Sequence, residues 1–175
     1  MLATVMMTGM TKIAQANFRK WNDALQTKDA KLIASLYSDK PGALSFLPTM
    51  SPEHVQGLNK TAVYFEHFMK KNPFGTVTDE SVQIFDNGNA YLHSGLYVFD
   101  LRLPTYLPTT GYPDKRDSVS ARFSMMWKSY NGTWKITHHH SSVNPGTHSQ
   151  KLADELYSNF MHSEYTRALT FENFC

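Results

Sequence analysis

The spacing of apolar residues changes once along the chain, and this change limits the folds that the sequence can adopt. Between residues 11 and 27, Ala14, Phe18, Trp21 and Leu25 recur at steps of four, three and four, the spacing of one helical face. From about residue 77 to residue 149 this spacing is absent, and strand-like segments alternate with turns. Helices followed by consecutive strands predict an α+β domain and argue against a doubly wound βαβ fold.

Cap and turn residues set the limits of the predicted elements. Asp29 can cap a second helix, and Asn59 can cap a third that continues to residue 71. Asn87-Gly88 and Asn131-Gly132 supply the positive φ angles that tight hairpin turns require. The expected strands cover residues 43–47, 81–85, 90–102, 118–128 and 133–142, with a Pro-rich loop over 103–117 and a C-terminal helix over about 150–169. We therefore expect a curved antiparallel sheet wrapped around the N-terminal helices, with an extra C-terminal helix.

The charge balance and the cysteine content narrow the class of protein. The chain has 17 Lys and Arg against 15 Asp and Glu, a formal net charge of +2, which argues against a nucleic-acid-binding protein. No apolar stretch approaches the ~20 residues needed to cross a bilayer, so we expect a soluble protein without a membrane partner. The single cysteine, Cys175, cannot form an intrachain disulfide. The compartment is left open: a plastid for an algal chain, the cytoplasm or periplasm for a bacterial one.

The segment from Trp134 to Ser142 contains the side chains best suited to form a catalytic or binding site. Successive side chains of a strand point to opposite faces. One face would carry Trp134, Ile136, His138, His140 and Ser142, and the other Lys135, Thr137, His139 and Ser141. Because the first face opens with Trp and Ile, we expect His138, His140 and Ser142 to line an interior pocket. A bulge between Thr137 and Ser142 would reverse this assignment, and Ser141 would then take the role of Ser142.

Two histidines at positions i and i+2 of a strand can also begin a zinc site, since both imidazoles point the same way. A catalytic zinc normally needs a third protein ligand. His54, His67 and His93 are candidates, and no spacing singles one out. The sequence signal for a metal site is therefore incomplete.

Residues 11–145 resemble the calcium/calmodulin-dependent kinase II association-domain-like branch of the NTF2-like superfamily, most clearly from Trp127 to the motif His138-His139-His140-Ser141-Ser142. Within that branch, this motif together with Phe46-Leu47-Pro48-Thr49 and Tyr64-Phe65 is similar to the iota-class carbonic anhydrases. The resemblance suggests an N-terminal extension over residues 1–10, an NTF2-like catalytic domain over 11–145 and a C-terminal helical extension over 146–175.

The resemblance implies a cone-shaped pocket in which carbon dioxide is hydrated reversibly to bicarbonate. Residues matching the family's pocket are Thr49, Tyr64, His140 and Ser142, and His138 on the same predicted face would contact the substrate with them. Some members of that class are described as metal-independent and others as manganese-dependent. We expect no cofactor here, with manganese or zinc as the alternative, because no third ligand can be named.

The residue types are consistent with this chemistry. Hydroxyl donors and an imidazole suit a small neutral substrate whose product is an anion with three oxygens. His140 would accept the proton of the attacking water, because imidazole titrates near neutrality, and the three hydroxyl groups would orient that water. Structural explanations also exist: Thr49 could make a turn hydrogen bond, and Tyr64 and His138 could belong to the core.

Two other functions are compatible with the sequence. The first is a non-enzymatic association module, because the kinase relatives use this fold to assemble into rings. Residues 90–99 have apolar side chains on both faces of the predicted strand, so one face should pack against a second copy in a homodimer. The second is a SnoaL-like small-ligand-binding or isomerase pocket, whose isomerase chemistry needs an inward carboxylate near a tyrosine. The sequence alone places no such carboxylate.

Overall fold

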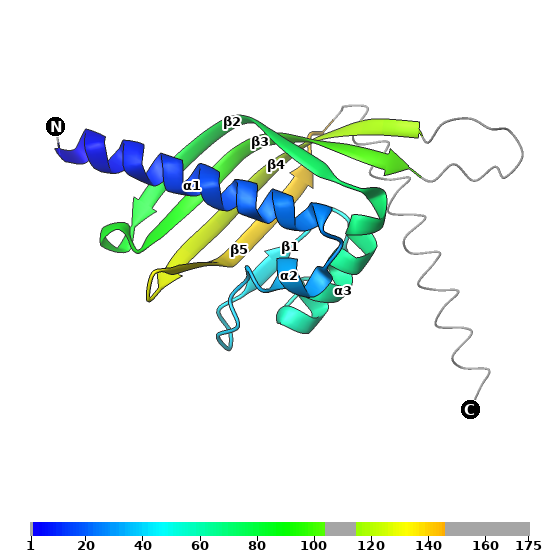
Figure 1. Cartoon of the computed structure of the whole chain (residues 1–175), viewed down its shortest axis with the longest axis horizontal. Coiled ribbons are helices and arrows are strands. Elements are labelled where there is room, and N and C mark those ends of the chain that lie inside the picture. Colours follow the sequence, from blue (N-terminus) through cyan, green and yellow to red (C-terminus); the bar gives the residue numbers. More distant parts are fainter. Residues whose placement is uncertain (1, 104–114, 146–175) are drawn as a thin grey trace, which may run out of the picture.

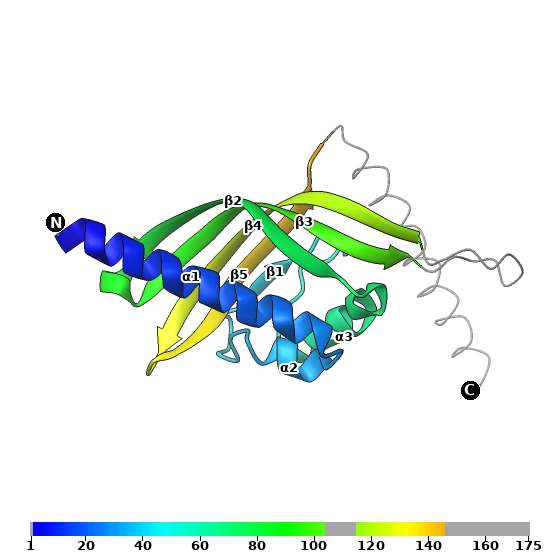
Figure 2. The ribbon, with the colours of Figure 1, turned by 45° about the horizontal axis from the view of Figure 1, so that its top comes forward.

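In the part of the chain that the structure describes, three α-helices lie on one face of a curved five-stranded sheet (Figure 1). The structure is a computed structural model, and it describes residues 2–103 and 115–145. The long helix α1 (Leu2–Gln26) crosses the concave face of the sheet, while α2 (Ala30–Ala34) and α3 (Leu58–Phe68) lie near the end of α1. A single turn of 3₁₀ helix, η1 (Met69–Lys71), continues α3. The sheet arches over α1 (Figure 2), so its two faces have different surroundings.

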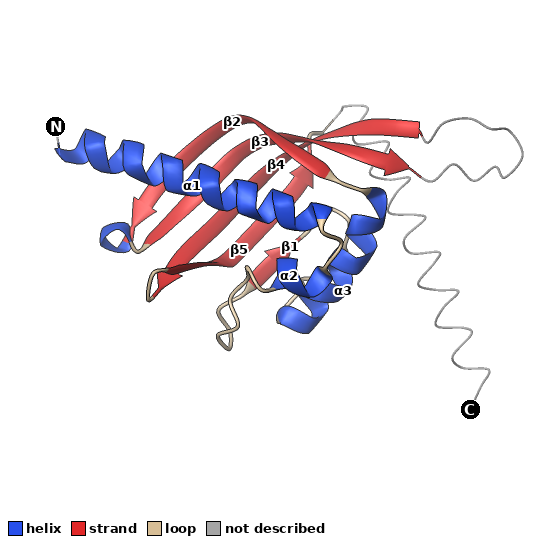
Figure 3. Ribbon diagram, viewed as in Figure 1, coloured by secondary structure: helices blue, strands red, loops and turns tan. Residues whose placement is uncertain are grey.

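The sheet is mixed, and its strand order is β1-β5-β4-β3-β2 (Figure 3). Its strands are β1 (Ser45–Leu47), β2 (Phe74–Phe85), β3 (Ala90–Leu103), β4 (Lys115–Tyr130) and β5 (Thr133–Val143). The pairs from β2 to β5 are antiparallel, which confirms the predicted meander, whereas β1 pairs parallel with β5. The strand predicted over residues 43–47 is therefore present, but its parallel direction departs from the expected antiparallel sheet, because three residues are too few to show how a strand pairs.

Cap and turn chemistry was predictable at most boundaries. The Asp29 side chain accepts hydrogen bonds from the backbone N–H groups of Lys31 and Leu32, each at 3.0 Å, and it caps α2 as predicted. The predicted Asn59 cap is wrong: α3 starts at Leu58 and is preceded by Gly57, whose φ of 81° places it in the left-handed region. Both hairpin turns form where predicted, and the two turn asparagines adopt positive φ angles of 51° and 52°.

Two predicted segments fall largely outside the part of the chain that the structure describes. They are the C-terminal helix over about 150–169 and most of the Pro-rich loop over 103–117.

The first helix begins at Leu2, well before the predicted start at residue 11. Its buried residues include the predicted stripe of Ala14, Phe18, Trp21 and Leu25.

Aromatic rings fill the space between the helices and the sheet. Trp21 of α1 meets Phe65 of α3 with its ring centroid 6.3 Å away, and Phe99 of β3 at 6.2 Å. Full burial of such side chains stabilises a fold by roughly 1.5–3 kcal/mol each. The rings meet edge to face, tilted or stacked, and a small cavity remains among them, where the polar residues described below meet.

Candidate active site

A bulge in β5 decides which of its histidines face the core. Trp127 of β4 pairs with Ile136, but the next residue, Met126, pairs with His138, so Thr137 is an extra residue in β5. After one extra residue, every following side chain of the strand points to the opposite face of the sheet from the one that simple alternation predicts. His139 is therefore buried at 3% exposure, whereas its neighbour His140 is exposed. The expectation that His138, His140 and Ser142 line the pocket is wrong; His139 and Ser141 line it instead.

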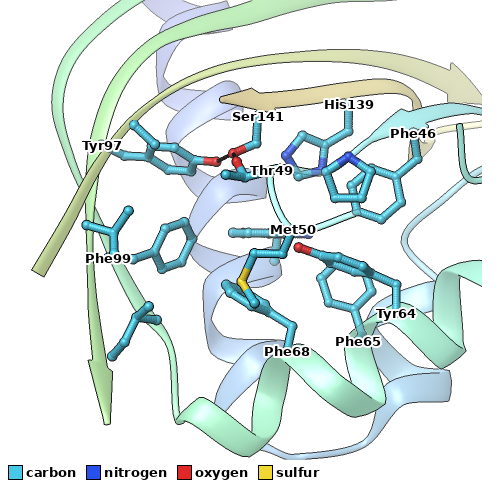
Figure 4. Close-up of a pocket in the computed structure, with 15 residues that line it drawn as sticks. Phe46, Thr49, Met50, Tyr64, Phe65, Phe68, Tyr97, Phe99, His139 and Ser141 are labelled. Atoms are coloured by element: carbon cyan, nitrogen blue, oxygen red, sulfur yellow. Dashed lines mark hydrogen bonds between the residues drawn. The ribbon is translucent and has the colours of Figure 1, made fainter. Parts of the chain in front are cut away.

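A small cavity lies between α3, the loop after β1 and the inner face of the sheet (Figure 4). Its polar residues are Thr49, Tyr64, Tyr97, His139 and Ser141, and most of the other lining residues are apolar. The space open to a water-sized molecule measures about 40 Å³, which corresponds to roughly three water-sized spheres. We call this space the Thr49–Ser141 cavity. Of the predicted site residues, Thr49 and Tyr64 are at this cavity, and His138, His140 and Ser142 are not.

Three hydroxyl groups form a chain along one wall of the cavity. The Tyr97 hydroxyl donates to Ser141 Oγ at 2.5 Å, and Ser141 Oγ lies 2.6 Å from Thr49 Oγ1 (Figure 4). The parallel pairing of β1 with β5 places Phe46 opposite His139. Because the two segments run in the same direction, Thr49, which follows the end of β1, reaches Ser141. Burial raises the pKa of Tyr97 above its ordinary value, while its bond to Ser141 acts in the opposite direction. The Tyr97 hydroxyl is therefore protonated at physiological pH.

A second chain of hydrogen bonds holds His139. Trp21 Nε1 lies 3.1 Å from the Tyr37 hydroxyl oxygen, and that oxygen lies 2.8 Å from His139 Nδ1. The imidazole also stacks on Phe46, with ring centroids 5.0 Å apart. Burial, and then the nearby imidazoles of His138 and His140, lower the pKa of His139 to about 3. His139 is therefore neutral at physiological pH, in contrast to a free imidazole.

Tyr64 projects from α3, and its hydroxyl group points toward the cavity (Figure 4). Its ring packs edge-on against Phe46 at a centroid distance of 5.1 Å. Burial and then the neighbouring Tyr97 raise its pKa well above the ordinary value. The hydroxyl makes no hydrogen bond to another described residue, so its hydrogen is available to a molecule in the cavity.

The outward histidines lie near one another on the opposite face of the sheet. The pKa of His138 is lowered by burial first, and then by the imidazoles of His140 and His54. His54 Nε2 in turn lies 3.0 Å from Ser45 Oγ. Within residues 2–103 and 115–145, no group of three or more His, Cys, Asp or Glu side chains is arranged to hold a metal ion.

Sequence reasoning missed an inward carboxylate. A bulge at Thr78, between the pairs of Val77 and Asp79, brings Glu80 onto the inner face of β2. Glu80 Oε2 lies 2.8 Å from Nε2 of the buried His93, and Gln15 donates to Oε1 at 2.5 Å. Burial lowers the pKa of His93, although the hydrogen bond and charge of Glu80 act in the opposite direction.

This pair borders a separate groove of about 710 Å³ between α1 and β2, not the Thr49–Ser141 cavity. The carboxylate that an isomerase would need near a tyrosine is therefore absent from the residues that line that cavity. The bulges at Thr78 and Thr137 leave no sequence signal of their own. Only the occurrence of His93 on the same face of β3 as Tyr91 and Tyr97 could have pointed to an inner polar cluster.

Comparison with known proteins defines the family. The model of the calcium/calmodulin dependent protein kinase II association domain matches residues 11–145. The chain therefore belongs to this family. No protein with a curated description matches the chain. A Xanthomonas campestris protein described as such an association domain is 30% identical, with a TM-score of 0.66, and the match covers 77% of this chain and 87% of that one.

More distant structures share the fold. The association domain of C. elegans CaMKII is 16% identical, with a TM-score of 0.58, over 78% of this chain and 97% of that one. A Streptomyces avermitilis protein described as a dehydratase of the NTF2-like family is 14% identical, with a TM-score of 0.64, over 77% and 96%. The fold is therefore NTF2-like. None of the described helices is long and apolar enough to cross a membrane.

Proposed function

We propose that this protein hydrates carbon dioxide reversibly to bicarbonate in the Thr49–Ser141 cavity. The observation that carries the proposal is the convergence of hydroxyl and imidazole groups on a small cavity in which none of the described lining residues is charged. Such a lining accepts a neutral substrate, and hydrogen-bond donors can stabilise the oxygens of an anionic product. The resemblance of the histidine and serine motif to iota-class carbonic anhydrases supports the same activity.

The hydroxyl chain leaves one hydrogen for a ligand. Tyr97, Ser141 and Thr49 have three hydroxyl hydrogens, and the two bonds between them use two. The third hydrogen belongs to Thr49 or to Ser141, depending on which of them donates, and it can bond to a molecule in the cavity. Together with the Tyr64 hydroxyl, it supplies two donors at neutral pH.

The reaction requires these donors where charge develops. The oxygen of a water molecule attacks the carbon of carbon dioxide, a new C–O bond forms, and one C=O electron pair moves to its oxygen. One proton of the water passes to solvent, and bicarbonate remains. Donors held in place before the reaction stabilise the negative oxygen without reorganisation, and removal of one such contact typically costs roughly 100- to 1,000-fold in rate.

Stopped-flow measurement of carbon dioxide hydration, with and without exhaustive chelation, tests the proposal. We expect activity above the uncatalysed rate that survives chelation. Loss of activity on chelation, with recovery on adding manganese or zinc, would overturn the metal-independent part. Absence of activity under every metal condition would overturn the proposed enzyme.

A second candidate function is the association module, which the outer face of the sheet favours. The strand register places Leu47, Leu92, Leu96, Val98 and Met126 on that face, opposite the buried side chains of the core. Leu96 and Leu47 are 37% and 39% exposed. Association through this face is compatible with catalysis in the cavity, because the two lie on opposite sides of the sheet.

A further inference from the structure

We propose that Trp21 and Tyr37 are positioning residues that hold His139 in the tautomer with its hydrogen on Nε2. His139 then serves the cavity as a neutral hydrogen-bond donor and not as the base that removes a proton from water. This role in the reaction rests on the proposed function, whereas the tautomer is a property of the protein without substrate.

The chain of hydrogen bonds has a direction because it begins at a group that can only donate. The indole Nε1–H of Trp21 has a hydrogen and no acceptor lone pair, so it donates to the Tyr37 oxygen at 3.1 Å. Tyr37 has one hydroxyl hydrogen, and its other hydrogen-bond partner is His139 Nδ1 at 2.8 Å. If Tyr37 donates that hydrogen, Nδ1 accepts it and the imidazole hydrogen must be on Nε2.

The opposite arrangement leaves more polar groups unpaired. If Nδ1 carried the hydrogen, Tyr37 would accept from both Trp21 and His139, and its own hydrogen would have no acceptor among the described residues. Tyr37 is only 1% exposed, so bulk water does not reach its hydroxyl. An unmade hydrogen bond at a buried group costs roughly 1–3 kcal/mol. The arrangement with hydrogen on Nε2 avoids this cost.

The surroundings of the ring also prevent it from exchanging its two nitrogens by rotation. The imidazole is stacked on Phe46 at an interplanar angle of 20°, and Trp21 meets it edge-on with centroids 5.5 Å apart. Rotation of the ring would break the bond to Tyr37 and disturb both contacts. Nε2 is buried, has no partner within the described residues, and belongs to a ring that lines the cavity.

Sequence reasoning gave the role of base to His140, but His139 is the histidine at the cavity, and the hydrogen on its Nε2 excludes that role. A nitrogen that already carries a hydrogen cannot accept the proton of water, and Nδ1 is occupied by Tyr37. With its pKa lowered to about 3, the ring also stays neutral. His139 can then bond to an oxygen of bicarbonate as a third donor, beside Tyr64 and the Thr49–Ser141 pair.

Nitrogen NMR of the histidine rings tests the tautomer directly in the protein without substrate. The His139 signals are identified by their loss in His139→Gln. We expect correlations typical of hydrogen on Nε2 and a bare Nδ1, unchanged between pH 8 and pH 5. A wild-type spectrum with hydrogen on Nδ1 would overturn the inference.

Two matched tyrosine variants test the positioning role. Tyr37→Phe should shift the His139 signals toward a mixture of tautomers, because Nδ1 loses its donor. Tyr91→Phe removes another buried hydroxyl, one that accepts from Asn17 at 2.8 Å and does not line the cavity, and it should leave those signals unchanged. Equal spectra for the two variants would refute the role of Tyr37. If Tyr37→Phe does not fold, Trp21→Phe replaces it, with a smaller shift expected in the same direction.

The spectra test the tautomer and the hydration assay tests the reaction, so either hypothesis can be refuted without the other. If the hydrogen is on Nε2 but the protein has no hydration activity, the tautomer is supported and the proposed reaction is refuted. If the protein hydrates carbon dioxide but the hydrogen is on Nδ1, the reaction is supported and the positioning role of Trp21 and Tyr37 is refuted.

Discussion

Ser141 joins the two other hydroxyl groups of the cavity wall, so its oxygen is the most informative atom to remove. We expect Ser141→Ala and Thr49→Ala each to lower the rate of carbon dioxide hydration by roughly 10- to 1,000-fold, the range for lost orienting or oxyanion contacts. Ser141→Ala also leaves the buried Tyr97 hydroxyl without its acceptor, at a cost of roughly 1–3 kcal/mol in stability. Thermal unfolding should therefore first show that each variant is folded at the assay temperature, and the stopped-flow assay then compares the hydration rates.

Ser142→Ala is the matched control for these variants. Ser142 is the next residue in β5, it pairs with Arg122, and it points to the outer face. Its removal should leave the hydration rate unchanged within about twofold. Similar rate losses for Ser141→Ala and Ser142→Ala would show that the loss reflects damage to the strand and not loss of a site residue.

The buried, neutral state of His139 predicts how stability depends on pH. Its pKa is about 3 in the folded protein against 6.5 for the ordinary group, so the unfolded chain binds more protons between these values. The contribution to stability is complete above pH 6.5 and is lost as the pH falls toward 3, by up to about 1.4 kcal/mol per pH unit. The lowered pKa values of His93 and His138 act in the same direction.

His139→Gln separates this contribution from those of the other groups. A glutamine can still accept from Tyr37 but does not titrate. Urea unfolding at several pH values should show a smaller fall in the free energy of unfolding for the variant than for wild type between pH 6.5 and pH 4. Parallel pH curves for the two proteins would contradict the prediction.

The bulges at Thr137 and Thr78 are the elements that limited prediction from sequence. The stripe on α1, the Asp29 cap and both Asn-Gly turns each depend on neighbouring residues, and all were predictable. The family motif identified Thr49 and Tyr64, and both lie at the cavity. His139 and Ser141 could not be chosen over His140 and Ser142, because the extra residue at Thr137 is fixed by pairing with β4, not by the local sequence.

The bulge in β2 also explains why one glycine is needed in the adjacent strand. A Cβ atom on Gly95 of β3 would overlap the backbone carbonyl of Asp79, which follows the bulge. The overlapping atoms are backbone, so the clash cannot be relieved by a side-chain rotation. We expect Gly95→Ala to lower the free energy of unfolding by about 3 kcal/mol, the upper end of the usual range for an added group in a packed interior.

Gly9→Ala serves as the comparison in denaturant unfolding. Gly9 lies in α1, and an added Cβ there meets no atom within 4 Å. Alanine is favoured over glycine in a helix by about 1 kcal/mol, so this variant should be as stable as wild type or more stable. If Gly95→Ala were as stable as Gly9→Ala, the close approach of β2 and β3 would not exist in solution.

On the scale of the whole molecule, the sheet separates two surfaces of different character. The face toward the helices carries the aromatic core and the Thr49–Ser141 cavity, whereas the outer face carries histidines, serines and scattered apolar residues. The bulge at Thr137 therefore decides which residues of the histidine and serine motif lie on each surface. His139 and Ser141 belong to the cavity, and His138 and His140 belong to the outer face, away from the cavity.

We expect a second copy of this chain to dock on that outer face. The chain belongs to an association-domain family, and a stable interface of the usual size, on the order of 1,600 Å², requires apolar residues at its centre. Leu96 is 37% exposed, and Leu92 and Val98 lie beside it on the same face of β3. Light scattering should give twice the 20.0 kDa of one chain at micromolar concentration.

Leu96→Glu should convert this dimer to a monomer, because a buried carboxylate without a partner is costly in an interface. Leu32→Glu is the matched control, since Leu32 is 44% exposed on α2, on the helical side of the sheet, and this variant should remain dimeric. A wild-type mass of 20.0 kDa across micromolar concentrations would contradict the dimer. Dissociation by both variants would place the interface elsewhere. Because the cavity opens on the other side of the sheet, the Leu96→Glu monomer should retain the hydration rate of wild type.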